Sequence, residues 1–305
     1  MAEISARAVM DLRERTGAGM MDCKAALKEA DGSFDEAVKV LRIKMGNKLT
    51  NRGERAAAEG IIAVVVLDDQ DGAIIELNSE TDFVARSDDF KALARELAEQ
   101  VARTKGHSVE TVLTQESVAQ PGTTVQDRLN DVFTKLRENI IFKRFEFIST
   151  DENGSLAGYV HVPAGDKLGV LIEIEAGSPE AAKSDAVKAL GRELAMQVAA
   201  SNPRYLSREE VSADALAQEQ DIARTTAQNE GKPAAALDKI VEGRVRKFYE
   251  ETVLLEQPWL REPKKTVAQV IKEAGAGVTL KRFVRYEVGQ VVGVETSGII
   301  KEDVE

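Results

Sequence analysis

An internal repeat constrains this chain more than any other feature of its sequence. The segment Lys91–Ala102 returns as Lys188–Ala199, and ten of the twelve positions are identical. Two strand-like runs precede each copy, and one follows it at a distance: Gly60–Leu67, Ala73–Asn78 and Phe142–Phe147 for the first copy, and Ser155–Val162, Leu168–Glu175 and Leu280–Tyr286 for the second. The order hairpin, helices, returning strand predicts an α+β fold in which each repeat forms an antiparallel sheet covered by helices.

Each of the two hairpins needs a turn between its strands. Asp71-Gly72 lies between the first two runs, and Asp-Gly is a strong signal for a tight hairpin turn. Ala164-Gly165-Asp166 separates the second pair. We therefore expect the turns at these two places.

The residues before the repeat predict a small helical domain of three short helices within 4–45. Thr16-Gly17-Ala18-Gly19 interrupts the helical pattern, and Asp31-Gly32 ends the second helix. Ser33 and Glu36 form a capping box for the third. The apolar positions at helical spacing are Ile4, Ala8, Val9 and Leu12, then Met21, Ala25, Ala26 and Leu27, then Ala37, Val38, Leu41 and Ile43.

The second repeat carries an insertion that reads as two helices around a tight turn. The range 207–229 has a helical apolar pattern, Gly231-Lys232-Pro233 stops it, and a second helix follows over about 234–250. Two interpretations of the apolar stripe stay open. It closes the hairpin on itself, or it binds a partner or a second copy. Its residues are Leu216, Ala223 and Ala227, facing Leu237, Ile240 and Val241.

Charge and hydrophobicity exclude some classes of function. The net charge of -11 argues against a general nucleic-acid binder, which needs a basic face for phosphates, and against a basic membrane-surface helix. The longest apolar run is Ile61–Leu67, whereas a membrane span needs roughly twenty residues. The first residues show neither a basic nor an apolar signal region. We expect a soluble, cytoplasmic protein of about two domains.

Residues for catalysis or metal binding are scarce. Cys23 is the single cysteine and reads as a small core residue. His107 lies in a polar loop, and His161 ends a strand, where either a structural role or a contact with a partner stays open. Gly17-Ala18-Gly19 has no preceding strand and reads as a turn between helices. We therefore expect no catalytic residues, no metal and no cofactor.

The run Thr81-Asp82-Phe83-Val84-Ala85 stands where a strand ends and a helix is about to begin. Thr81 or Asp82 could cap that helix while Phe83 folds into the core. The second repeat, however, has Ala176-Gly177-Ser178-Pro179 at the same junction, with no acid–aromatic pair. The scaffold does not require Asp82-Phe83, which favours a function specific to the first repeat.

Two stretches carry a resemblance to a known family. Glu76–Arg86 resembles the internal signature of bacterial elongation factor Ts throughout. The N-terminal signature is matched by Leu12-Arg13, by 16–22, by Lys24 and by Ala26-Leu27, with a departure at Ala25, where the family usually has a polar or basic residue. Further similarity lies at Gln197–Ser201, Gly231–Pro233, Val241–Arg244 and Gln257-Pro258. The resemblance covers the chain to about residue 290.

The resemblance implies guanine nucleotide exchange on elongation factor Tu during translation, without bond-making chemistry. It implies that an acid–aromatic wedge enters the partner near its magnesium and phosphate site, and that the N-terminal module docks on the partner's G domain. The wedge residues would be Thr81, Asp82, Phe83, Val84 and Ala85, and the docking residues Leu12, Arg13, Thr16, Gly17, Gly19, Met20 and Met21. His161 is a candidate for a further contact.

With the resemblance, the predicted organisation comprises six parts. They are a helical ubiquitin-associated-like domain (1–45), a connector (46–59), core subdomain N (60–150), core subdomain C (151–206 and 251–290), an inserted antiparallel helical hairpin (207–250) and a C-terminal tail (291–305). We expect elongation factor Tu, GDP-bound and nucleotide-free, as the partner, with no direct nucleic acid and no membrane. A homodimer or a two-plus-two complex stays open. So do two other functions: an adaptor without effect on nucleotides, and an enzyme built from scattered carboxylates.

Overall fold

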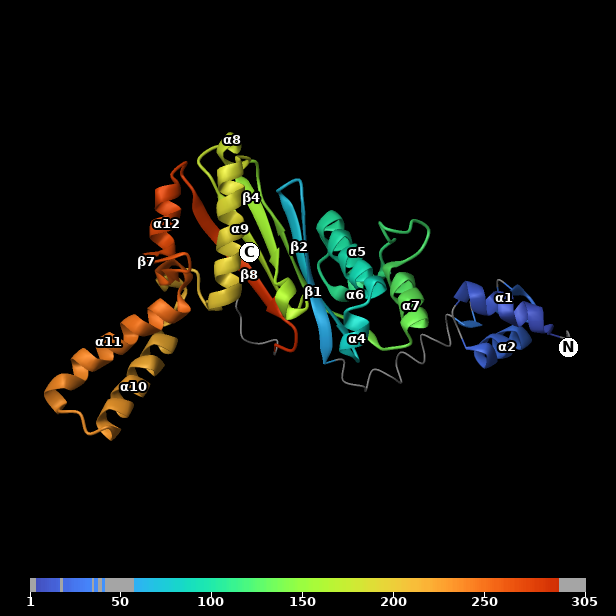
Figure 1. Cartoon of the computed structure of the whole chain (residues 1–305), viewed down its shortest axis with the longest axis horizontal. Helices are drawn as coiled ribbons and strands as arrows, with labels where there is room; N and C mark the ends of the chain where they lie inside the picture. The colour runs from blue at the N-terminus through green and yellow to red at the C-terminus, as the bar shows by residue number, and fades with distance from the viewer. Residues whose placement is uncertain (1–3, 17–18, 35, 38–39, 42–57, 291–305) are drawn as a thin grey trace, which may run out of the picture. The chain divides into compact units, whose positions relative to one another are not determined.

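The computed structural model describes residues 4–16, 19–34, 36–37, 40–41 and 58–290 (Figure 1). The strands are β1 (Glu59–Leu67), β2 (Asp71–Ser79), β3 (Ile140–Ser149), β4 (Gly154–Val160), β5 (Leu168–Glu175), β6 (Pro258–Trp259), β7 (Glu262–Thr266) and β8 (Thr279–Glu287). The α-helices are α1 (Ala6–Thr16), α2 (Met20–Glu29), α4 (Asp82–Ala85), α5 (Asp88–Thr104), α6 (Val109–Thr114), α7 (Val125–Leu136), α8 (Pro179–Ala182), α9 (Asp185–Ser201), α10 (Ala213–Asn229), α11 (Ala234–Thr252) and α12 (Val267–Ala274). Short 3-10 turns cover Val162–Ala164, Arg208–Glu210 and Leu254–Glu256.

The described strands form sheets of order β1-β2-β3 and β4-β5-β8, with a small β6-β7 ribbon. In the second sheet β5 pairs antiparallel with both β4 and β8. Helices and antiparallel sheet together confirm the predicted α+β class. The finer subdomain architecture and the predicted domain boundaries stay predictions.

The N-terminal helices have a small core of their own. Val9 and Leu12 of α1 pack with Cys23, Ala26 and Leu27 of α2, and Cys23 is fully buried, as a core residue should be. The hydroxyl of Ser33 accepts the backbone N–H of Glu36 at 3.5 Å. Parts of the predicted third helix, and the connector 46–57, lie outside the described residues. The likeness to a ubiquitin-associated domain therefore stays a prediction.

The repeated segment forms equivalent helices, α5 and α9. Ser87 and Ser184 cap their N-termini by accepting the N–H of Phe90 and Val187. Lys105 and Asn202 end them in the left-handed conformation, at φ 53° and 47°, while their own N–H groups bond back into the last turn. Both ends of the repeat are therefore set by the same local interactions.

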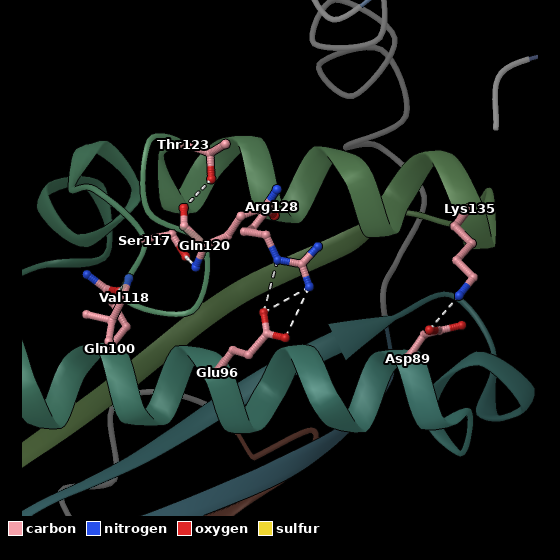
Figure 2. A network of polar contacts seen from close by, with 9 residues as sticks. All are labelled: Asp89, Glu96, Gln100, Ser117, Val118, Gln120, Thr123, Arg128 and Lys135. Carbon is pink, nitrogen blue, oxygen red and sulfur yellow. Dashed lines mark hydrogen bonds and ion pairs between the residues drawn. The ribbon is translucent and has the colours of Figure 1, made fainter. Parts of the chain in front are cut away.

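A buried glutamine anchors each of these helices to the segment that follows. Gln100 donates to the side chain of Gln115 (3.2 Å) and to the carbonyl of Glu116 (3.1 Å). It also accepts the N–H of Val118 at 2.7 Å, and Figure 2 draws both of these residues. Gln197 donates to Gln257 and to the carbonyl of Pro258 and accepts the N–H of Leu260 at 2.9 Å. The repeat thus includes side-chain hydrogen bonds as well as backbone.

The first hairpin turn differs from the prediction. Asp68 and Asp69 have φ values of 51° and 63°, and the N–H of Gln70 donates to the carbonyl of Leu67 at 3.0 Å. These features describe a tight turn with two left-handed central residues, which aspartate tolerates. Gly72 belongs to β2, where an added Cβ would lie 2.9 Å from the Leu156 side chain. The absence of a side chain at Gly72 therefore leaves room for the Leu156 side chain. The prediction of a turn at Asp71-Gly72 is wrong, because both residues belong to β2.

Contacts divide the chain into two compact units. The first unit comprises 1–63, 75–147 and 162–167, and the second comprises 64–74, 148–161 and 168–305. Because 64–74 carries the β1–β2 turn and 162–167 carries the loop before β5, each unit contains a turn from the other copy of the repeat. We describe the two units separately.

The two turns make equivalent contacts in their separate units. In the second unit the carbonyl of Asp69 accepts the N–H of Leu156 at 2.8 Å, and its carboxylate pairs with Lys188 at 2.6 Å. In the first unit Asp166 accepts the N–H of Ile62 at 2.7 Å and pairs with Lys91 at 2.8 Å. Lys91 and Lys188 are equivalent positions of the repeat, so each copy contributes its turn to the other.

The insertion forms the antiparallel pair α10 and α11, which lie side by side (Figure 1). Ala223 and Ala227 of α10 and Leu237 and Val241 of α11 are buried. Gly231, at φ 71°, makes the turn between the helices. The apolar stripe therefore closes the hairpin on itself over most of its length, and binding of a partner by the hairpin stays untested.

Candidate partner-binding site

The short helix α4 begins the candidate site, and its sequence explains where it starts. Thr81 has an extended backbone, and its hydroxyl accepts the N–H of Val84, as an N-cap should. Asp82 lies in the first turn, which the helix dipole favours for an acid. Ser87 then caps α5. The sequence left open whether Thr81 or Asp82 caps α4, and the structure shows that Thr81 is the N-cap.

Phe83 projects into solvent, with 82% of its surface exposed. Ala85, two residues on, is buried, and so is Phe90 in the first turn of α5. Asp82 is half-buried and forms an ion pair with Arg86 at 3.2 Å. A core role for Phe83, which the sequence left open, is therefore excluded. Exposed phenylalanine beside an acid is a feature of surfaces that bind another protein.

Carboxylates from both sides hold the loop that precedes α4. Glu138 accepts the backbone N–H of Thr81 at 3.0 Å and the Thr81 hydroxyl at 2.7 Å. Glu80 accepts the N–H of Asn139 at 3.0 Å, and the hydroxyl of Ser79 donates to the carbonyl of Thr81 at 2.9 Å. We call Glu80, Thr81, Glu138 and Asn139 the carboxylate clamp. It joins the start of α4 to the segment between α7 and β3.

The equivalent junction of the second repeat is held in another way. Ser178 caps α8 by accepting the N–H of Ala181 at 3.2 Å, and Pro179 and Glu180 stand where the first repeat has Asp82 and Phe83. The N–H of Gly177 donates to the carbonyl of Ala276 at 2.7 Å. This junction is thus fixed by backbone contact and presents no aromatic ring, as its sequence predicted.

The predicted docking residues of the N-terminal helices separate into buried and exposed ones. Leu12 is fully buried in the core between α1 and α2, so its side chain supports the module from inside, and its part in docking stays a prediction. Arg13 is exposed, and Met20 and Met21 are exposed by 47% and 76%. Gly19 precedes α2 as its N-cap. Gly17 and the side chain of Thr16 lie outside the described residues.

Three further residues bear on the predicted sites. Met10, which the sequence did not single out, is also exposed on α1, on the polar side of the helical pattern. His161 is half-buried, and its Nδ1 lies 2.7 Å from the hydroxyl of Tyr159. This hydrogen bond gives His161 a structural role, while contact with a partner stays untested. His107 is exposed.

Sequence reasoning also missed Glu138. Its partner Thr81 is 57 positions away along the chain, and no local pattern links the two. Only a residue-by-residue view of the folded loop could find it.

Two further observations on the described residues concern a metal site and a membrane span. Within those ranges, no cluster of three or more His, Cys, Asp or Glu side chains is arranged to hold a metal ion. Likewise, none of the described helices combines the length and apolar character of a membrane span.

An exposed aromatic ring beside an acid on a clamped loop, together with exposed methionines on a helical module, is typical of proteins that act by binding another protein. Comparison with known protein families shows which family the chain belongs to. A family model described as Elongation factor TS matches residues 80–290. The chain belongs to the elongation factor Ts family, whose members are translation elongation factors.

Individual relatives resemble the chain over nearly its full length. It is 43% identical to elongation factor Ts of Clostridium botulinum (strain Alaska E43 / Type E3), over 96% of this chain and 94% of the relative. It is 45% identical to that of Mycolicibacterium smegmatis, over 95% and 100%. For elongation factor Ts of Aquifex aeolicus the identity is 42%, over 94% and 98%.

Proposed function

We propose that this protein promotes the release of GDP from elongation factor Tu, and hence its loading with GTP, by binding the factor and disturbing its magnesium and phosphate site. Membership of the elongation factor Ts family supports the partner and the exchange activity. The exposed ring of Phe83 on a clamped loop is the observation that carries the mechanism.

The physical basis is thermodynamic linkage. A protein that accelerates nucleotide release binds the nucleotide-free partner more tightly than the loaded one, and the coupling between the two ligands is reciprocal. Burial of an exposed phenylalanine contributes roughly 1.5–3 kcal/mol. If Phe83 is buried only in the open form of the partner, that free energy favours loss of nucleotide and magnesium.

The residues around Phe83 have different parts in this proposal. Asp82 offers a carboxylate beside the ring, at a place where the partner holds a cation. Thr81 and Val84 shape the loop, and Ala85 anchors α4 from inside the core. No bond in a substrate is broken, so the protein acts as an exchange factor and not as an enzyme with chemistry of its own.

A second surface would add affinity. The exposed Met20 and Met21, with Arg13 and Gly19, form the part of the N-terminal module that we propose to dock on the partner's G domain. Methionine suits such a surface because its flexible, polarisable side chain adapts to a partner. Thr16 and Gly17 belong to the same proposed surface by resemblance.

Release of labelled GDP from elongation factor Tu tests the proposal directly. Adding catalytic amounts of this protein, with excess unlabelled GDP or GTP, should accelerate release many-fold over the spontaneous rate. A release rate that does not change with the concentration of this protein would refute the exchange function.

A further inference from the structure

The carboxylate clamp has features that packing alone does not require. The Glu138 side chain accepts two hydrogen bonds from one residue, from the N–H of Thr81 at 3.0 Å and from its hydroxyl at 2.7 Å. In return, Glu80 accepts the N–H of Asn139, the residue after Glu138, at 3.0 Å. The two segments therefore exchange three hydrogen bonds, each with a carboxylate as acceptor, and such bonds are stronger than neutral ones.

The clamp also has a rigid support. Glu138 follows α7, which ends at Arg137 in the left-handed conformation at φ 62°. Two ion pairs hold α7 against α5: Arg128 with Glu96, in a bidentate arrangement, and Lys135 with Asp89 at 2.6 Å (Figure 2). These two contacts join α7, which leads to Glu138, to α5.

Phe83 lies only two residues beyond Thr81, in a helix of a single turn. Such a helix has almost no stability of its own, since nucleation is unfavourable and few hydrogen bonds form. The direction of an 82% exposed ring is then set by the residues that fix the start of the helix. Those residues are Thr81, through its cap, and Glu138, which holds Thr81.

We propose that Glu138 is a positioning residue for nucleotide exchange: it pre-orients Phe83 so that the ring enters the partner without an ordering cost. The inference rests on the proposed exchange function and adds to it a residue that acts through Thr81. Pre-organisation acts by removing the entropy that a free loop loses on binding.

The test combines Glu138→Gln with Phe83→Ala in the full chain. The amide of the glutamine keeps one acceptor and loses the other, so we expect GDP release to slow by roughly tenfold. In the Phe83→Ala background the same Glu138→Gln substitution should have almost no further effect, because there is no ring left to orient. If Glu138 served only the general stability of the fold, Glu138→Gln would slow GDP release by the same factor in the natural protein and in Phe83→Ala.

A direct measurement accompanies the kinetics. Hydrogen–deuterium exchange of the segment 78–85 in the free protein should be faster in Glu138→Gln than in the natural protein, while the α5 helix keeps its protection. Thr81→Ser retains the hydroxyl that Glu138 accepts, so the hydrogen–deuterium exchange of 78–85 should stay close to that of the natural protein. Thr81→Val removes the hydroxyl and should speed the hydrogen–deuterium exchange of this segment as Glu138→Gln does. The two Thr81 variants keep the test valid if a Glu138 variant folds poorly.

Glu116→Gln is a matched control. Glu116 also accepts a loop N–H, that of Gly122 at 2.8 Å, in the same half of the molecule but in a different loop. The Glu116→Gln variant should leave GDP release unchanged. If the natural protein accelerates release and Glu138→Gln is as active as Glu116→Gln, the positioning role is refuted and the exchange function stands. If the natural protein fails to accelerate release, both proposals fall.

Discussion

The two junctions that follow β2 and β5 have the same plan and are held by different means. In the first repeat, side chains fix the junction: Glu138 holds Thr81, and Glu80 holds the segment after α7. In the second repeat, the backbone of Gly177 lies against Ala276, so closely that an added Cβ would be 2.9 Å from the Ala276 oxygen. The comparison teaches that the same junction can be held either by side-chain carboxylates or by a close backbone contact.

The difference at the helices has a consequence for function. The helix α4, held at its N-cap Thr81 by Glu138, presents Phe83 to solvent. At the equivalent positions of α8, Pro179 is half-buried and Glu180 is exposed. Duplication thus supplied two equal scaffolds, and one of them carries the apolar ring.

The largest expected effect separates the two junctions by function. Phe83→Ala should reduce GDP release from elongation factor Tu by roughly tenfold to a hundredfold, because the ring's burial in the complex is worth about 1.5–3 kcal/mol. Glu180→Ala, the same truncation at the equivalent position of α8, should leave release unchanged. Equal losses in the two variants would break the comparison, and stopped-flow fluorescence of labelled GDP measures both.

The next effect tests how far the two repeats are alike. Gln100→Ala and Gln197→Ala each remove a buried amide and leave the backbone N–H of Val118 or Leu260 without its acceptor. Each should lower the free energy of unfolding by about 2–3 kcal/mol. Urea unfolding followed by circular dichroism measures this loss. A negligible cost for one of the two variants would show that its network does not stabilise the repeat.

A smaller effect tests a difference within the repeated helices. Gly191 stands in α9 where α5 has Ala94, and a Cβ on Gly191 would lie 2.9 Å from the Cβ of Ala157. Gly191→Ala should therefore lower stability by about 1 kcal/mol, because overlap outweighs the gain in helix propensity. In the matched control Gly243→Ala, in α11, an added Cβ meets nothing within 4 Å, and stability should rise. A stabilising Gly191→Ala would contradict the close packing of α9.

The smallest effect concerns the exposed pair Lys188–Asp69. The hydrogen bond and the charge of Asp69 raise the pKa of Lys188 above its ordinary value of 10.5. Since the folded-state pKa is the higher one, the pair stabilises the protein fully below pH 10.5 and loses its effect as the pH rises through the raised value. Asp69→Asn should remove this alkaline loss and shift Tm only slightly at neutral pH. An alkaline Tm profile identical in the two proteins would exclude the pair as its source.

Much of the fold follows from local patterns in the sequence. The repeat predicts α5 and α9, because Ser87 and Ser184 cap them and their apolar residues recur at helical spacing. The strands and the inserted hairpin also lie near their predicted positions. The α+β class was within reach for this reason.

What the sequence could not give depends on residues far apart in the chain. Asp71-Gly72 has the local chemistry of a turn, but Leu156 and Leu171 occupy the space that makes Gly72 necessary within β2. Leu12 looks like part of a motif, yet its place in the core between α1 and α2 decides that its side chain is hidden. For Phe83 the local pattern allowed two roles, and only the packing of α4 in the folded chain shows that the ring is exposed.

The exchanged turns make the two repeats interdependent for folding. Each copy lacks a binding surface for its own turn, since Asp69 is held by Leu156 and Lys188, and Asp166 by Ile62 and Lys91. Cleavage of the chain between β3 and β4 would therefore leave two incomplete fragments. We expect each fragment to be largely unstructured alone and the mixture to regain its circular dichroism spectrum, because each compact unit draws residues from both copies of the repeat.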